Sequence, residues 1–225
     1  EDMQDEKNGT MYKVARLLDV SLNMENAGTW DNLEDGTPVW RLHLQSRGAK
    51  GMALHFDGFN IPDGAKFFVY TPDHSMVLGA FTSYNNSGSN ATSIGMLPGE
   101  DLILEYVAPR ANSKTFGFKK VTEPEIQIGN VSYFYRGMEL FGFGSKGTGF
   151  GASEDCEVNI NCSEGTNWQI QKKGVARIYT VAGGYGGYCT GTLVNNTANN
   201  GTPYFLTADH CGGGEAASAW AADSV

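Results

Sequence analysis

Short runs in which apolar and polar residues alternate recur through the first half of this chain and favour a mostly β fold. Between residues 39 and 46, Trp40 and Leu42 are separated by polar neighbours, which is the period of a half-buried strand, and residues 52–57 repeat it. Further strand-like runs separated by turn signals such as Pro-Asp-Gly and Leu-Pro-Gly cover residues 66–70, 76–81, 101–107 and 115–118. Short strands at this spacing predict a β-sandwich.

Residue composition agrees with strands joined by turns. The chain has 30 glycines, which supply the positive φ angles that turns need. Residues 11–22 fit a helix or a strand by period, and the runs that follow favour a strand.

The core should include the large apolar residues of the alternating runs: Trp40, Phe56, Phe67 and Tyr106. The first three histidines should lie on the surface or on strand faces: His43, His55 and His74.

The charge balance argues against nucleic acid as a partner. Twenty-five Asp and Glu against 16 Lys and Arg give a net charge of −9, which a polyanion would repel. No apolar run approaches the roughly 20 residues that cross a bilayer, so no membrane span is expected. Residues 1–8 lack the basic and apolar regions of an export signal, which predicts that any such signal was removed or never included.

All cysteines lie in the last third of the chain, which predicts a domain boundary near residue 150. Residues 137–151 contain six glycines and resemble an exposed linker. We therefore expect a β-sandwich over residues 1–136, a Gly-rich linker over 137–152 and a second domain over 153–225. The Gly-x-Gly-x-x-Gly pattern at residues 142–147 matches a dinucleotide fingerprint, but neither a preceding strand nor a following helix is evident.

The stretch YCTGTLVNNTANNGTPYFLTADHCG, residues 188–212, carries the clearest chemical signal. Its two cysteines, Cys189 and Cys211, are 22 positions apart, and His210 immediately precedes the second. This pattern describes a β-hairpin closed by a disulfide, which would stabilise the fold by roughly 3 kcal/mol and hold the imidazole rigidly. Free buried thiols, or a zinc site formed with Cys156, Cys162 and His210, are the alternatives, although the close CxxC pair typical of zinc is missing.

This stretch resembles the corresponding segment of bacterial lysyl endopeptidases, which are trypsin-like enzymes with the chymotrypsin double-barrel fold. The Thr-Ala-x-His-Cys element of that family carries the catalytic histidine, so the resemblance implies this role for His210. ASEDCEVNINC is similar to the mature amino-terminal segment of the family, which implies that Cys156 and Cys162 form disulfides with distant partners or, alternatively, with each other. Residues 39–107 resemble the pro-region of such precursors, as in VWRLHLQS and LPGEDLILEY.

The resemblance implies a serine endopeptidase of which only the front part is present. A triad in this family runs His, Asp, Ser, and the Asp and Ser would follow Val225. Neither Gly-Asp-Ser-Gly-Gly nor Gly-x-Ser-x-Gly occurs here, so this chain is expected to be inactive and its trypsin-like barrel incomplete. Asp209 is an unsuitable partner for His210, because adjacent strand residues point to opposite faces.

We therefore expect a secreted serine endopeptidase zymogen that acts on proteins or peptides, with its own pro-domain as a partner and without a cofactor. Disulfides place it outside the cell or in the periplasm. If the enzyme cuts after lysine, the bond from Lys146 to Gly147 is a candidate activation site, with a plain solvated lysine as the alternative. The rival hypothesis is a secreted binding or adhesion protein whose protease-like domain is degenerate.

Overall fold

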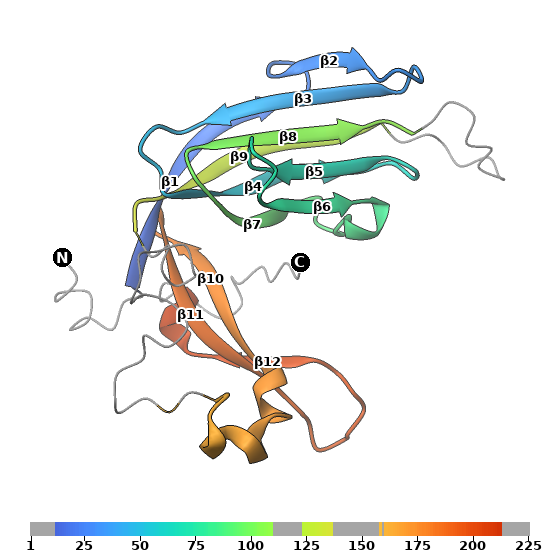
Figure 1. Cartoon of the computed structure of the whole chain (residues 1–225). Helices are drawn as coiled ribbons and strands as arrows, with labels where there is room; N and C mark the ends of the chain where they lie inside the picture. The colour runs from blue at the N-terminus through green and yellow to red at the C-terminus, as the bar shows by residue number, and fades with distance from the viewer. Residues whose placement is uncertain (1–11, 110–122, 137–157, 159, 213–225) are drawn as a thin grey trace. The chain divides into compact units, whose positions relative to one another are not determined.

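The computed structural model describes residues 12–109, 123–136, 158 and 160–212, and these form two compact units. The first, the sandwich unit, is Leu17–Tyr135. The second, the hairpin unit, combines residues 12–16 with the chain from Arg136 onward. Figure 1 shows that both units consist mainly of antiparallel strands, which confirms the expected mostly β class. The expected run at residues 115–118 lies outside the described residues.

One sheet of the sandwich unit contains five antiparallel strands. Their order is β2 (Thr29–Asn32), β3 (Pro38–Gln45), β8 (Asp101–Val107), β5 (Lys66–Tyr70) and β6 (Val77–Phe81). Trp40 of β3 pairs with Tyr106 of β8, and Tyr106 pairs with Phe67 of β5. This register places the large aromatic residues in one row on the same face of the sheet.

The other sheet of the sandwich unit contains β1 (Tyr12–Asn23), β9 (Glu125–Phe134), β4 (Gly51–Asn60) and β7 (Thr92–Pro98), in that order. β1 confirms the expected strand over residues 12–22. A short 3₁₀ turn, η1 (Ser83–Asn85), precedes β7, and the hydroxyl of Thr82 accepts a hydrogen bond from its first turn. The register of β4 shifts next to His55 and Phe56, so strict alternation does not continue to the end of this strand.

The core lies between the two sheets. Trp40, Phe56, Phe67 and Tyr106 are all buried in it, as the sequence predicts. Phe59 joins them, and its ring centroid lies 5.2 Å from that of Phe56 and 5.7 Å from that of Phe67, both in edge-on geometry. Such pairs add about 0.5–1.5 kcal/mol each to the free energy gained by burial. The core is therefore aromatic at its centre.

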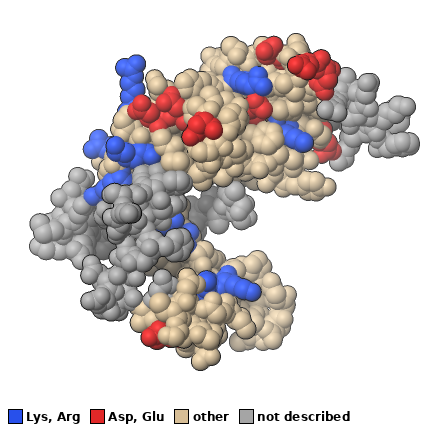
Figure 2. Space-filling model, viewed as in Figure 1, with Lys and Arg blue, Asp and Glu red and all other residues tan. Residues whose placement is uncertain are grey.

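The charged side chains of the sandwich unit are mixed in sign. On the face seen in Figure 2, basic and acidic residues are interspersed. The Nε atom of Arg41 lies 2.6 Å from a carboxylate oxygen of Glu105, and the same oxygen accepts a hydrogen bond from the hydroxyl of Tyr70. These groups cross three neighbouring strands, β3, β8 and β5, on the side away from the core.

The hairpin unit contains three antiparallel strands, β10 (Val175–Ala182), β11 (Tyr185–Val194) and β12 (Tyr204–Thr207). Three 3₁₀ turns accompany them: η3 (Ser163–Trp168), η4 (Gln171–Gly174) and η5 (Asp209–Gly212). Among the described residues these strands do not close into a barrel. None of the described helices is long and apolar enough to span a membrane.

The turn between β10 and β11 takes up only part of the Gly-Gly-Tyr-Gly-Gly pattern at residues 183–187. Only Gly183 and Gly184 form it, with φ angles of 57° and 79°. Two residues with positive φ are sufficient for the tight turn that matches the twist of a hairpin. Tyr185 already pairs with Ala182, so the last three residues of the pattern belong to β11.

Candidate active site

The site is built on a hairpin whose ends are joined by a disulfide. β11 and β12 pair from Gly191 opposite Thr207 to Val194 opposite Tyr204. Cys189 lies in β11 before this paired stretch, and Cys211 follows β12. Their sulfurs are bonded, with the Cα atoms 5.9 Å apart. The disulfide therefore holds the two strands together at the end of the hairpin that lies opposite its connecting loop.

The loop between β11 and β12 is held by asparagine side chains. The Nδ2 group of Asn196 donates a hydrogen bond of 2.6 Å to Oδ1 of Asn200. Asn199 has a φ of 53°, a left-handed conformation that asparagine tolerates better than most residues, and Gly201 follows with a φ of 74°. The run of asparagines thus gives the loop a defined turn and determines where β12 begins.

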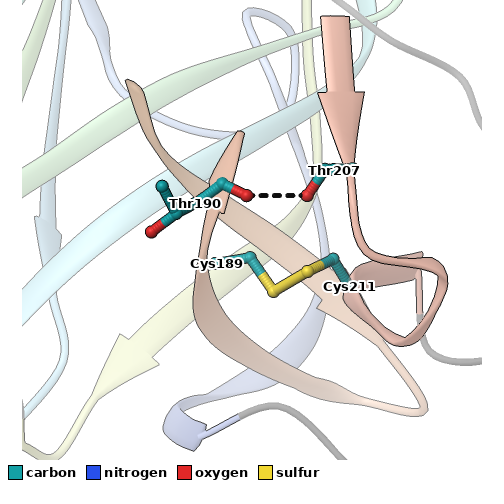
Figure 3. Close-up of a disulfide and its surroundings, with 4 residues drawn as sticks. All are labelled: Cys189, Thr190, Thr207 and Cys211. Carbon is teal, nitrogen blue, oxygen red and sulfur yellow. Dashed lines mark hydrogen bonds between the residues drawn. A yellow bond between two sulfur atoms is a disulfide. The ribbon is translucent and has the colours of Figure 1, made fainter. Parts of the chain in front are cut away.

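The chain turns sharply at the end of β12, as Figure 3 shows. The hydroxyl of Thr207 donates a hydrogen bond of 2.9 Å to the carbonyl of Thr190 on β11. The backbone N–H of Cys211 then donates to the carbonyl of Ala208 at 3.0 Å and closes the turn η5. Cys211 is 2% exposed, so the disulfide is anchored inside the unit.

His210 lies in η5, between the end of β12 and the buried Cys211. Its side chain is exposed, and a ring nitrogen lies within 4.8 Å of the sulfurs of Cys189 and Cys211. The hairpin and the disulfide therefore position an imidazole that solvent can reach. Asp209 precedes it in the same turn, not in a strand, so the expectation about adjacent strand residues does not describe the local geometry.

The sulfurs near His210 do not suit a metal ion. Cys189 and Cys211 are bonded to each other and therefore offer no thiolate ligand. Only the imidazole of His210 remains in this group, and one nitrogen does not form a metal site. The zinc alternative finds no support in this arrangement.

Of the other predicted site residues, the structure describes only Cys162. Cys162 is exposed at the start of η3 and forms no disulfide with Cys189 or Cys211. Cys156, Lys146 and Gly147 lie outside the described residues. The partners of the first two cysteines and the activation bond therefore stay predictions.

Exposed apolar side chains around the hairpin are a feature that sequence analysis did not single out. Leu206 is 64% exposed on one face of β12, and Phe205 is 43% exposed on the other. Leu193 of β11 pairs with Phe205 and is 53% exposed. Strands that are apolar on both faces are typical of sheets covered on both sides. Within the described part of the chain nothing covers them.

A second histidine, His55 of the sandwich unit, has serine hydroxyls on both ring nitrogens. Its Nδ1 lies 2.8 Å from Oγ of Ser93, and its Nε2 lies 2.7 Å from Oγ of Ser132. A histidine beside a serine resembles a base with its nucleophile, but Ser132 is fully buried, so no substrate can reach it. Burial lowers the pKa of His55. This group is a structural network, in agreement with the strand-face position expected for His55.

Comparison with known proteins points to one family. The family model described as "Lysyl endopeptidase, C-terminal domain" matches residues 150–224, which include the whole hairpin. A lysyl endopeptidase of Pseudomonas aeruginosa is 31% identical over 121 residues, which is 52% of this chain. The chain spans 24% of the length of that relative. No solved structure matches the chain.

Proposed function

We propose that this chain, which is similar to lysyl endopeptidases over residues 150–224, is the front part of a trypsin-like serine endopeptidase precursor in which His210 is the general base. The observation that supports this role is the exposed imidazole of His210, which a disulfide and a strand end hold within the segment that the family model matches. A general base needs both properties, because it must be reachable and must keep its ring in one place.

The proposed chemistry is acyl transfer to a serine that lies downstream of residue 225. His210 accepts the proton of the serine hydroxyl while the serine oxygen bonds to the carbonyl carbon of the substrate peptide. The same proton then passes from His210 to the leaving amine as the carbon–nitrogen bond breaks. Water, activated by the same imidazole, hydrolyses the acyl-enzyme. The proposal includes no cofactor.

The substrate and the location of the enzyme belong to the same proposal. The name of the Pseudomonas aeruginosa relative favours cleavage after lysine, and protein or peptide substrates follow from it. The disulfide between Cys189 and Cys211 favours an oxidising compartment, either outside the cell or in the periplasm. The sandwich over residues 1–136 is then the pro-domain, and cleavage between Lys146 and Gly147 is the candidate activation step.

The test uses the full-length protein and a fluorophosphonate probe, which labels activated serines. The natural protein should be labelled, and His210→Ala should abolish labelling and lower kcat by a factor on the order of 10⁴–10⁶. His43→Ala is the matched control, because His43 is an exposed histidine of β3 and should leave labelling unchanged. Equal labelling of the His210 variant would overturn its role. A folded full-length protein that takes no label would favour the non-catalytic binding protein.

A further inference from the structure

The edge of β11 that faces away from β10 has two partners in succession. Gly191–Val194 pair with β12, whereas Tyr185–Tyr188 pair with the first residues of β1. Ala15 lies opposite Gly186, and Arg16 lies opposite Tyr185. A strand from the start of the chain therefore covers the part of this edge that β12 leaves open.

The pairing of β1 with β11 is buried. Val14 and Ala15 are fully inaccessible to solvent, and Gly186, opposite Ala15, and Gly187, opposite Lys13, are also buried. Glycines in a strand allow another backbone to approach closely. On Gly186 a Cβ would overlap the Tyr179 ring. Tyr179 belongs to β10, so Gly186 leaves room for the neighbouring strand on one side and pairs with Ala15 on the other.

Lys13 makes one contact with Arg136 and one with β11. Nε of Arg136 donates a hydrogen bond of 2.7 Å to the carbonyl of Lys13, and because Arg136 follows β9 this bond stays within the amino-terminal piece. The ammonium of Lys13 lies 5.0 Å from the centre of the Tyr185 ring, in cation–π geometry. The strand is therefore joined to β11 by its backbone pairing and by the cation–π contact of Lys13.

We propose that residues 12–16 are a strand that binds the edge of β11 by β-augmentation, and that this pairing keeps the amino-terminal segment bound after the chain is cut between the two predicted domains. The cut belongs to the function proposed above, whereas the pairing does not depend on it. Arg16 continues directly into Leu17 of the sandwich unit, so an anchored strand also retains the sandwich. Because Tyr12 lies opposite Tyr188, the described pairing reaches the residue next to Cys189 and supports the strand that carries the disulfide.

A cross-link tests the pairing directly in the 225-residue chain. A recognition site for an added, specific protease is inserted between residues 146 and 147, and the pair Arg16→Cys and Tyr185→Cys is introduced. After oxidation and cutting, the two pieces should run together on a denaturing, non-reducing gel. The matched control pairs Arg16→Cys with Leu206→Cys, which lies on β12 and is exposed, and its pieces should separate. Separate pieces in the first variant would overturn the proposal.

A second arm measures whether the pairing holds the pieces together. After cutting, the pieces of the natural sequence should elute together from a sizing column. Val14→Asp, which places a carboxylate at a buried position, should separate them, whereas Arg16→Asp should not, because Arg16 is exposed. Separation of the natural pieces, or joint elution of the Val14 variant, would contradict the proposal. If the Val14 variant fails to fold, the cross-link decides alone. Neither arm measures peptidase activity, so failure here is distinct from failure of the proposed function.

Discussion

Gly191 of β11 lies directly against the ring of Phe205 of β12. A Cβ on Gly191 would overlap two carbons of that ring, and it would also approach the carbonyl oxygen of Leu206. The ring therefore occupies the space that any other residue at position 191 would need. This contact sets the spacing of β11 and β12 two residues after Cys189 in the chain.

Substitution Gly191→Ala should destabilise the hairpin unit by about 1 kcal/mol, because the half-exposed Phe205 ring must swing aside to admit a methyl group. The measurement is the free energy of unfolding of the oxidised chain in denaturant. Gly95→Ala in β7 is the control, since a Cβ there meets no neighbour and no positive φ is involved. A Gly191 variant as stable as this control would show that β11 and β12 do not pack as described.

Removing the disulfide should destabilise the same unit. The cross-link closes a loop of 22 positions, which stabilises a fold by about 3 kcal/mol in the chain-entropy model. We expect the double variant Cys189→Ala and Cys211→Ala to lower the melting temperature of the hairpin unit, followed by circular dichroism. Cys162→Ala should have little effect, because Cys162 is exposed. Unchanged melting of the double variant would contradict a structural role for the bond.

The stability of the sandwich unit should depend on pH through His55. Burial holds the pKa of His55 below its usual value, and the charge of Asp57 opposes this effect only in part. The unfolded chain then binds a proton more readily than the folded chain. Stability should therefore be complete above about pH 6.5 and should fall as the pH drops below that value, until the folded form is protonated as well.

Denaturant unfolding between pH 5 and pH 8 measures this dependence. His55→Gln should flatten the profile even if it lowers stability at every pH, because it also removes the two serine contacts. His43→Gln is the matched control, since His43 is exposed and hydrogen-bonded to Asp101 at 2.7 Å. Identical profiles for the natural sequence and the His55 variant would show that His55 does not cause the dependence of stability on pH.

Strands with regular alternation could be predicted from the sequence, and irregular ones could not. β5 and β8 begin and end at the expected residues, because their alternation is unbroken and turn signals flank them. β9 was not predicted, since Gly129 and Asn130 interrupt its apolar residues and register shifts accompany its pairing with β4. β2 was also not predicted: all four of its residues are exposed, and it exists through its pairing with β3.

In the site, too, contacts between residues close in the sequence could be predicted, and contacts between residues far apart in the sequence could not. The hairpin that carries His210 was predicted, because two strand-like runs and two cysteines lie close together in the sequence. The pairing of residues 12–16 with β11 was not predicted, since Val14 and Ala15 gain their partners only when distant parts of the chain meet. Gly191 was not singled out either, because its importance depends on the ring of a residue in another strand.

The pairing of β1 with β11 also sets an order of events during synthesis. Residues 12–16 leave the ribosome before the sandwich does, and their partners at Tyr185–Tyr188 are made only after the whole sandwich sequence has been translated. The β10–β11 hairpin, with its two-glycine turn, can form as soon as it emerges, because its contacts are local. Residues 12–16 must therefore wait for their β11 partner, and their docking completes the edge of β11 next to Cys189.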